Sequence, residues 1–324
     1  MFLLKSSQGF CTLLALRKHL LLLSLACVVV GVLGSQTPGD SDWQATAGGK
    51  MAFEIASVKL AKQGVPRITP WTRMIYDRGD AKPPGGSFSA SLPLGFYILF
   101  AYKLVAFEAM DMDAQLPKWA NEPYAIDAKA AGNPTKDQIR LMMQSLLADR
   151  FKLKVHFETK VVPVLAVTLV KPGKLGPKLL PHSEGPPCPD SIDGNPSPLI
   201  PPLKPGVPWP PQCGTIDQIG TRDGTWLGSR NTTMGLLASA LYNPQFGIDT
   251  PVVDQTGLPG RFDFILELPS GIISFGPRPL NPDDPGPEPI LLKALREQLG
   301  LKLKPSNGEV RTIIIDHVER PSEN

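Results

Sequence analysis

The chain carries an internal repeat, and a repeat defines the folding unit before any local propensity is considered. Three landmarks recur in the same order: 86–102 returns as 224–242, 124–130 as 262–268, and 151–154 as 301–304. The offsets between the copies are about 138 to 150 residues. The sequence therefore predicts two related units, each long enough to bury a core of its own.

Each unit is predicted to run strand, helix, strand, helix and two final strands. In the first unit, Thr135-Lys-Asp-Gln138 is a capping box, and five apolar residues from Ile139 to Leu147 follow at helical spacing. In the second, Pro289 opens a helix that Gly300 ends. The final strands are expected over 152–159 and 164–170, and over 301–304 and 310–318. Helices between strands, with a terminal hairpin, predict an α+β fold in which helices pack on antiparallel or mixed sheets.

Proline marks the boundaries, because fixed φ angles and missing N–H groups prevent helices and central strands. Of the 36 prolines, 21 lie in two tracts, 172–214 and 269–289. We expect a signal peptide over 1–34, a flexible leader over 35–52, a first repeat over 53–171, a Pro-rich linker over 172–221, and a second repeat over 222–324 with a Pro/Gly loop over 269–289.

The N-terminus has the pattern of an export signal. Three basic residues, Lys5, Arg17 and Lys18, precede an apolar run from Leu20 to Leu33. That run of about 14 residues suits a signal-peptide core better than the roughly 20 residues that span a bilayer. We therefore expect cleavage near Gly34 or Ser35 and an extracytoplasmic protein, periplasmic or secreted. An uncleaved N-terminal anchor is the alternative.

Charge and cysteine content fit that location. Cleavage removes three of the 33 basic residues and no acidic one, which leaves 30 basic against 30 acidic residues. A neutral chain has no electrostatic footprint for nucleic acid or anionic lipid. Two of the four cysteines remain, Cys188 and Cys213, both in the Pro-rich tract. In an oxidising compartment this pair predicts one disulfide that pins the linker; two free thiols are the alternative.

Several motifs together resemble a known family. They are Leu116-Pro-Lys-Trp119, Asn133-Pro-Thr-Lys136, the run 141–153, Val252-Val-Asp-Gln-Thr-Gly-Leu258, Gly260-Arg-Phe-Asp-Phe264, Glu297-Gln-Leu-Gly-Leu-Lys-Leu303 and the C-terminal run 315–324. The chain resembles, over 51–324, an uncharacterised soil-associated secreted family that is expanded in Acidobacteria. The resemblance implies a bacterial, exported protein and transfers no catalytic residue. Some relatives are joined to a membrane metallopeptidase of the β-lactam-sensor type, which implies a sensory or binding module.

Motifs that would signal chemistry are mostly missing. The sequence has no Gly-x-Ser-x-Gly, no His-Glu-x-x-His and no phosphate-binding loop, so no cofactor is predicted. His156-Phe-Glu158 and His317-Val-Glu319 place a His and a Glu on one face of each predicted strand. Those four side chains are weak candidates for a metal site, because nothing fixes the two strands as neighbours. We favour the interpretation that they lie on the solvent-exposed faces of half-buried strands.

Asp254 and Asp263 flank Gly257 and Gly260, where an aspartate more often bonds its own turn than works as a catalytic base. The first hypothesis is thus a non-enzymatic extracytoplasmic binding or interaction module with an unknown envelope or extracellular partner. The alternative is a cell-envelope hydrolase, possibly metal-dependent. That enzyme needs a cleft where two or three of six side chains converge: His156, Glu158, Asp254, Asp263, His317 and Glu319.

Overall fold

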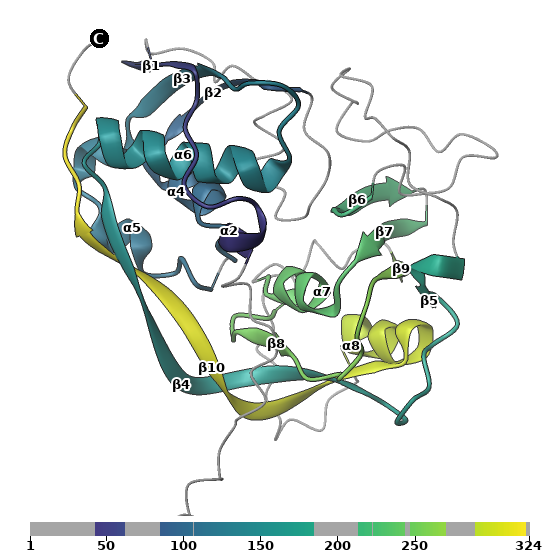
Figure 1. Cartoon of the computed structure of the whole chain (residues 1–324). Helices are drawn as coiled ribbons and strands as arrows, with labels where there is room; N and C mark the ends of the chain where they lie inside the picture. Colours follow the sequence, from purple (N-terminus) through teal and green to yellow (C-terminus); the bar gives the residue numbers. More distant parts are fainter. Residues whose placement is uncertain are drawn as a thin grey trace, which may run out of the picture. The chain divides into compact units, whose positions relative to one another are not determined.

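The computed structural model describes residues 43–61, 85–105, 107–184, 213–221, 223–243, 247–269 and 289–321 (Figure 1). The predicted signal peptide and Cys188 lie outside these residues. Within them no helix is long and apolar enough to cross a membrane. The described residues form a mixed α and β fold with three sheets and few helices.

The first half of the chain forms a three-stranded antiparallel sheet with strand order β1-β3-β2. Its strands are β1 (Ile55–Leu60), β2 (Ser87–Pro93) and β3 (Pro123–Lys129), and its helices are α2 (Trp43–Thr46), α4 (Leu94–Ala101), α5 (Met112–Gln115), η2 (Lys118–Asn121) and α6 (Lys136–Arg150). Alternate residues of β2 are buried, among them Phe88 and Leu92, as period-2 packing requires. The Tyr97 hydroxyl of α4 lies 2.7 Å from the Tyr124 carbonyl, which ties that helix to β3.

Helix α6 confirms the predicted capping box. The Thr135 hydroxyl accepts the Gln138 N–H, and the Gln138 side chain accepts the Thr135 N–H. All five predicted apolar residues of the stripe are buried. The sequence also suggests that Lys136 lies on the outer face, and this is wrong: it is 3% exposed. Arg140, one turn later, is 1% exposed and pairs with Asp137, so two basic side chains are buried near the start of this helix.

The second half forms a four-stranded sheet with strand order β5-β9-β7-β6. Its elements are β5 (Leu179–Pro181), η3 (His182–Glu184), β6 (Ile216–Thr221), β7 (Gly224–Thr232), α7 (Met234–Leu241), β8 (Val252–Asp254), β9 (Phe262–Pro269), α8 (Ile290–Ala294) and the π-helical η5 (Leu295–Leu299). The strands β5 and β6 lie inside the span expected to be linker, because residues at both ends of that span pair with β9 and β7.

A long two-stranded antiparallel ladder, here called the central ladder, joins the two halves. Strand β4 (Lys154–Leu169) pairs antiparallel with β10 (Leu301–His317) along nearly its full length, and β8 adds a short parallel partner to β4. The sequence predicts two short strands at the end of each half, and this is wrong: each pair is one continuous strand. Pro163 and Gly308 lie within these continuous strands. Pro163 is tolerated because its nitrogen points away from β10. Gly308 packs closely on β4, since a Cβ there would lie 3.0 Å from a methyl group of Val164.

The two ends of the central ladder pack on two different hydrophobic cores. The start of β4 and the end of β10 pack on the first core, through Leu153 and Ile313. The end of β4 and the start of β10 pack on the second, through Val167 and Leu301. Each half contains a strand, a helix, a strand, a helix and a strand in the same order: β2, α4, β3, α6 and β4 in the first, and β7, α7, β9, α8 and β10 in the second, where β8 comes between α7 and β9. The strand β2 pairs antiparallel with β3, and β7 pairs antiparallel with β9. That the two halves superimpose as a true repeat stays a prediction.

Candidate functional site

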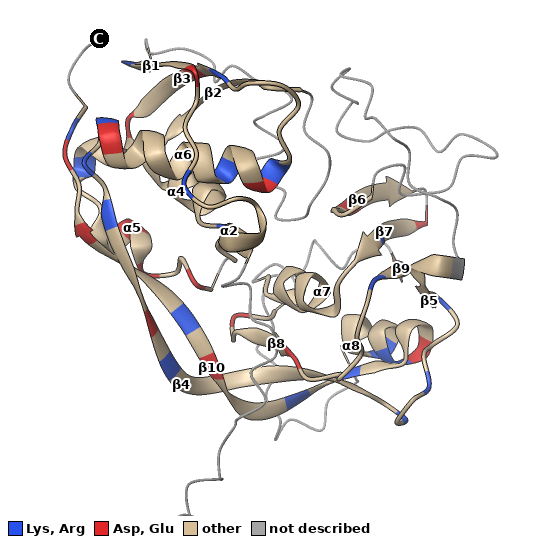
Figure 2. Ribbon diagram, viewed as in Figure 1, with Lys and Arg blue, Asp and Glu red and all other residues tan. Residues whose placement is uncertain are grey.

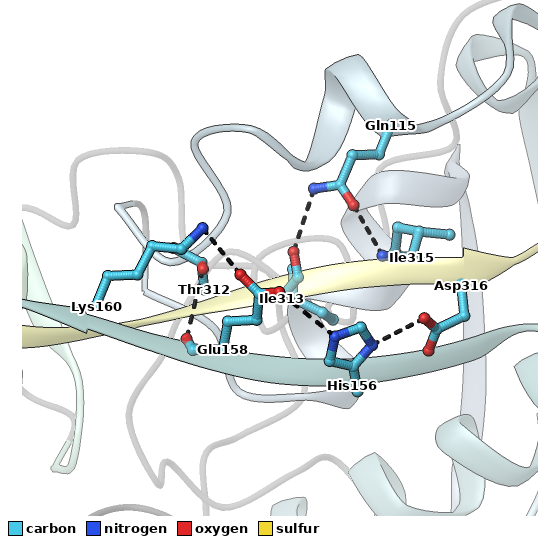
Figure 3. Close-up of polar contacts among 8 residues, drawn as sticks. All are labelled: Gln115, His156, Glu158, Lys160, Thr312, Ile313, Ile315 and Asp316. Carbon is cyan, nitrogen blue, oxygen red and sulfur yellow. Dashed lines mark hydrogen bonds and ion pairs between the residues drawn. The ribbon is translucent and has the colours of Figure 1, made fainter.

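A cluster of polar side chains runs along the central ladder of β4 and β10 (Figure 3). His156 Nδ1 lies 2.8 Å from Asp316 Oδ1, and His156 Nε2 lies 3.8 Å from Glu158 Oε1. Lys160 Nζ lies 2.9 Å from Glu158 Oε2. Asp316, His156, Glu158 and Lys160 thus form a row of alternating charge when the imidazole is protonated. Figure 2 shows acidic and basic residues along both strands.

Strand periodicity builds this row. Residues 156, 158 and 160 share one face of β4, while Phe157 between them packs toward the first core. Asp316 joins from β10 because the pairing register shifts between Ile315 and His317, where one extra residue bulges toward His156. The bulge is a tertiary feature that no sequence pattern announced.

The cluster is solvated, and its electrostatics are correspondingly mild. The side chains of His156, Glu158 and Asp316 are 50%, 43% and 43% exposed. The hydrogen bond to Asp316 is the main reason that the pKa of His156 is raised. The hydrogen bond from Lys160 is the main reason that the pKa of Glu158 is lowered. Each direction favours the charged row near neutral pH.

Gln115 fastens the other edge of β10 beside this cluster. Its amide nitrogen donates to the Ile313 carbonyl at 3.2 Å, and its amide oxygen accepts the Ile315 N–H at 2.8 Å. The Gln115 side chain therefore satisfies main-chain groups of β10 that a neighbouring strand would otherwise bond (Figure 3). Arg311 completes the surroundings, with its guanidinium 4.4 Å from the Phe157 ring centroid and 3.0 Å from Glu108.

The other predicted pair, His317 and Glu319, forms a contact of its own. His317 Nε2 lies 2.8 Å from Glu319 Oε1. Across the described part of the chain, no three His, Cys, Asp or Glu side chains are grouped so that they could hold a metal ion. Each of the three described histidines is instead matched with a carboxylate at hydrogen-bond distance.

The third pair is one that sequence reasoning missed. His182 Nδ1 lies 2.7 Å from Asp263 Oδ1, which also accepts the Asn231 N–H at 2.8 Å. Asn231 has a φ of 56° and lies at a register shift in β7, and both features are common beside functional sites. Asp263 Oδ2 is buried and accepts no hydrogen bond from any described residue. The alternation of Phe262-Asp-Phe264 was the available signal, but His182 lay in the expected linker.

Asp254 performs the local role that its sequence context suggests. Its Oδ1 accepts the Thr256 N–H at 2.8 Å and the Thr256 hydroxyl at 2.7 Å, which closes the turn after β8. The main chain of Cys213 forms an isolated parallel β-bridge with that of Arg230, a residue of β7. Because Cys188 lies outside the described residues, the pairing of Cys188 with Cys213 stays a prediction.

The comparisons with known proteins identify the family and nothing more specific. Residues 96–318 match the family described as "Protein of unknown function (DUF3738)", and the chain belongs to that family. No curated protein and no solved structure matches the chain. The match confirms an uncharacterised family; the soil association, the Acidobacteria and the secretion that the resemblance implied stay predictions.

Proposed function

We propose that this chain is a non-enzymatic, extracytoplasmic binding or interaction protein of a bacterium. The observation that carries the proposal is the separation of the candidate catalytic side chains. His156 pairs with Asp316, His182 with Asp263, and His317 with Glu319, while Asp254 bonds its own turn. A hydrolytic site of this kind needs a nucleophile, a base and an orienting group around one point. Each described histidine has its own carboxylate partner, and His156, which also has Glu158 at 3.8 Å, lies on a solvated strand face.

Export is the first part of the proposal to test. The full chain, expressed in a bacterium with its own N-terminus, is fractionated, and the exported species is examined by intact mass. We expect a mature chain that begins near Ser35 and contains no titratable thiol when unfolded without reductant. A full-length chain in the membrane fraction supports the anchor instead. Two free thiols in an exported chain contradict the disulfide.

Binding is the second part. The purified chain is incubated with isolated bacterial envelope polymers, and both retention on the polymer and release of soluble fragments are measured. We expect retention without release. Release of fragments contradicts a purely binding role and supports the hydrolase.

The hydrolase alternative is favoured by one specific observation, the partly buried His182–Asp263 pair. An aspartate that orients an imidazole is a frequent part of hydrolytic sites. If fragments are released, Asp263→Asn and His182→Gln should abolish the release, and His317→Gln, whose imidazole pairs elsewhere, serves as the control.

The metal-dependent form of that alternative has its own test. We expect added zinc to leave the melting temperature nearly unchanged. A site occupied at 100-fold its dissociation constant stabilises a protein by about 2.7 kcal/mol. A rise of several degrees that His317→Ala abolishes therefore supports the metal site and contradicts our reading.

A further inference from the structure

One edge of β4 pairs with no described strand where the central ladder crosses between the two cores. The main chain of Leu165 donates to Pro251, and Val167 accepts from Gln255, so these residues point away from β10. The register with β10 is continuous from residue 155 to residue 169. By strand alternation, every odd-numbered residue from 155 to 163 therefore also points its main-chain polar groups away from β10.

Nothing described occupies that edge. The strand β8 covers β4 only from Leu165 to Val167. The outward groups of Val155, Phe157, Thr159 and Val161 make no main-chain hydrogen bond in the described structure. Figure 1 likewise draws no described element beside this stretch of β4 on the side away from β10. Val161 is 70% exposed at the middle of the stretch.

The matching edge of β10 is protected, which makes the contrast informative. Gln115 and the Glu108 carbonyl bond its outer edge at Ile313 and Ile315. Further along, Pro305 has no N–H to offer. Proteins shield free strand edges with such devices. The open edge of β4 has one of them, Pro163, at its far end. From Val155 to Val161 it keeps the main-chain groups to which another strand can add.

We propose that two copies of this chain associate through antiparallel pairing of their β4 strands about a twofold axis at Thr159. In this register Glu158 of each copy lies opposite Lys160 of the other, so the charges are self-complementary. Phe157 of each copy lies opposite Val161 of the other, an aromatic and β-branched pair that stabilises sheets. Thr159 meets its own counterpart.

The neighbouring registers lack this complementarity. A shift of the axis by one residue, to Lys160, sets Lys160 against Lys160 and Glu158 against Val162. This register still sets outward peptide groups against outward groups, so the side-chain pairs alone distinguish it from the register at Thr159. The twofold at Thr159 keeps the outward groups of 157, 159 and 161 facing outward groups of the second copy. It also joins two Glu158–Lys160 pairs, each already 2.9 Å apart within its strand, into one ring of four charges.

This dimer stands apart from the proposed function, since either a binding protein or an enzyme could form it. Charge reversal tests it by sedimentation of the purified full chain over a range of concentrations. We expect a concentration-dependent dimer. Glu158→Lys or Lys160→Glu should each weaken it by about tenfold, because two cross-strand attractions become repulsions. The double exchange, E158K with K160E, should restore it.

The matched control is Lys304→Glu, the same reversal on an exposed residue of β10, which should leave the dimer intact. A chain that stays monomeric at every concentration overturns the proposal. So does a dimer that both single reversals leave unchanged, or one that the double exchange fails to restore.

A cross-link reads the register directly. Opposed residues in a hydrogen-bonded antiparallel pair have Cα atoms about 5.5 Å apart, within the span of a disulfide. Thr159→Cys should therefore give a covalent dimer under oxidising conditions, and mass spectrometry should find two identical peptides joined through the introduced thiols. Lys304→Cys should give no such dimer. Failure of Thr159→Cys to cross-link a chain that sediments as a dimer places the interface elsewhere and overturns the proposal.

Discussion

The two halves of the molecule solve the same geometric problem with different residues. In the first, α6 ends at Arg150 and the chain turns into β4 through Lys152, which has a φ of 51°. In the second, η5 ends at Leu299 and the chain turns into β10 through Gly300, with a φ of 69°. Both turns need a left-handed residue, which a helix C-terminus usually takes as glycine.

The difference lies in what passes close to each turn. A Cβ on Gly300 would lie 2.6 Å from the nitrogen of Gly176, so that position has no room for a side chain. The first half accepts a lysine at the same place in its turn. Local conformation alone thus selects a left-handed residue, and only tertiary packing forces glycine.

The last helix of each half is also hydrogen-bonded at its C-terminus by the segment that follows a strand of the central ladder. The chain after β4 donates the Gly176 N–H to the Leu299 carbonyl at 2.9 Å. The chain after β10 donates the Glu319 N–H to the Phe151 carbonyl at 2.7 Å. Each half therefore depends on the strand that begins in the other, and a defect at either crossing should weaken the whole molecule.

Gly176→Ala should break this arrangement with the largest effect. Its Cβ would collide with main-chain atoms of Gly300 and Leu299, which cannot rotate away. We expect a loss of about 4 kcal/mol or more of unfolding free energy, measured by urea melts. Gly220→Ala is the control: nothing lies within 4 Å of its Cβ, so it should change stability by at most about 1 kcal/mol. Equal effects would show that the two glycines do not approach closely.

Leu146→Ala tests whether α6 is a packing element of the first core. Leu146 is 7% exposed, and its truncation should cost about 2–5 kcal/mol of unfolding free energy. Leu295→Ala, at a residue of η5 that is 0% exposed, should cost the same range if the second core depends equally on its helix.

The control for these truncations is Asp149→Ala, at a side chain that is 70% exposed near the end of α6. It should stay within about 0.5 kcal/mol. If Leu146→Ala proves as harmless as Asp149→Ala, the apolar stripe of α6 is an interaction surface.

Lys152→Gly sharpens the comparison of the two turns in the opposite direction. Glycine removes the penalty of a left-handed side-chain residue, so we expect a gain of about 1 kcal/mol. Lys154→Gly, two residues later in β4, should instead lose about 0.5–1 kcal/mol because glycine weakens a strand. A loss at both positions would mean that the Lys152 side chain contributes contacts that outweigh the strain of its φ angle.

The smallest expected effect is the titration of His156, followed by NMR of the imidazole. Its midpoint should lie above the ordinary histidine value of about 6.5, because the hydrogen bond to Asp316 raises its pKa. A raised pKa means that the stabilisation is complete below about pH 6.5 and is lost as pH rises through the folded-state pKa. Asp316→Asn should move the midpoint down. An unchanged midpoint would mean that this contact is not populated in solution.

Local patterns determined much of this fold. The capping box of Thr135 and Gln138 fixed where α6 begins, because both hydrogen bonds form between residues three apart. Strands were likewise expected over the recurring segments 124–130 and 262–268, where β3 and β9 form, and period-2 alternation put His156 and Glu158 on one face. These features depend on neighbours in the chain, which a sequence displays directly.

Contacts between distant residues were decided only by the tertiary structure. The sequence predicted separate short strands on either side of Pro163 and of Gly308, whereas strand pairing makes each pair one continuous strand, with Pro163 turned outward and Gly308 close to Val164. It gave Asp263 no partner, because His182 is 81 residues away in the chain and reaches it only when β5 pairs with β9. Lys136 looked exposed for the same reason. A periodic pattern specifies which residues share a face, but the elements that cover that face come from elsewhere in the chain.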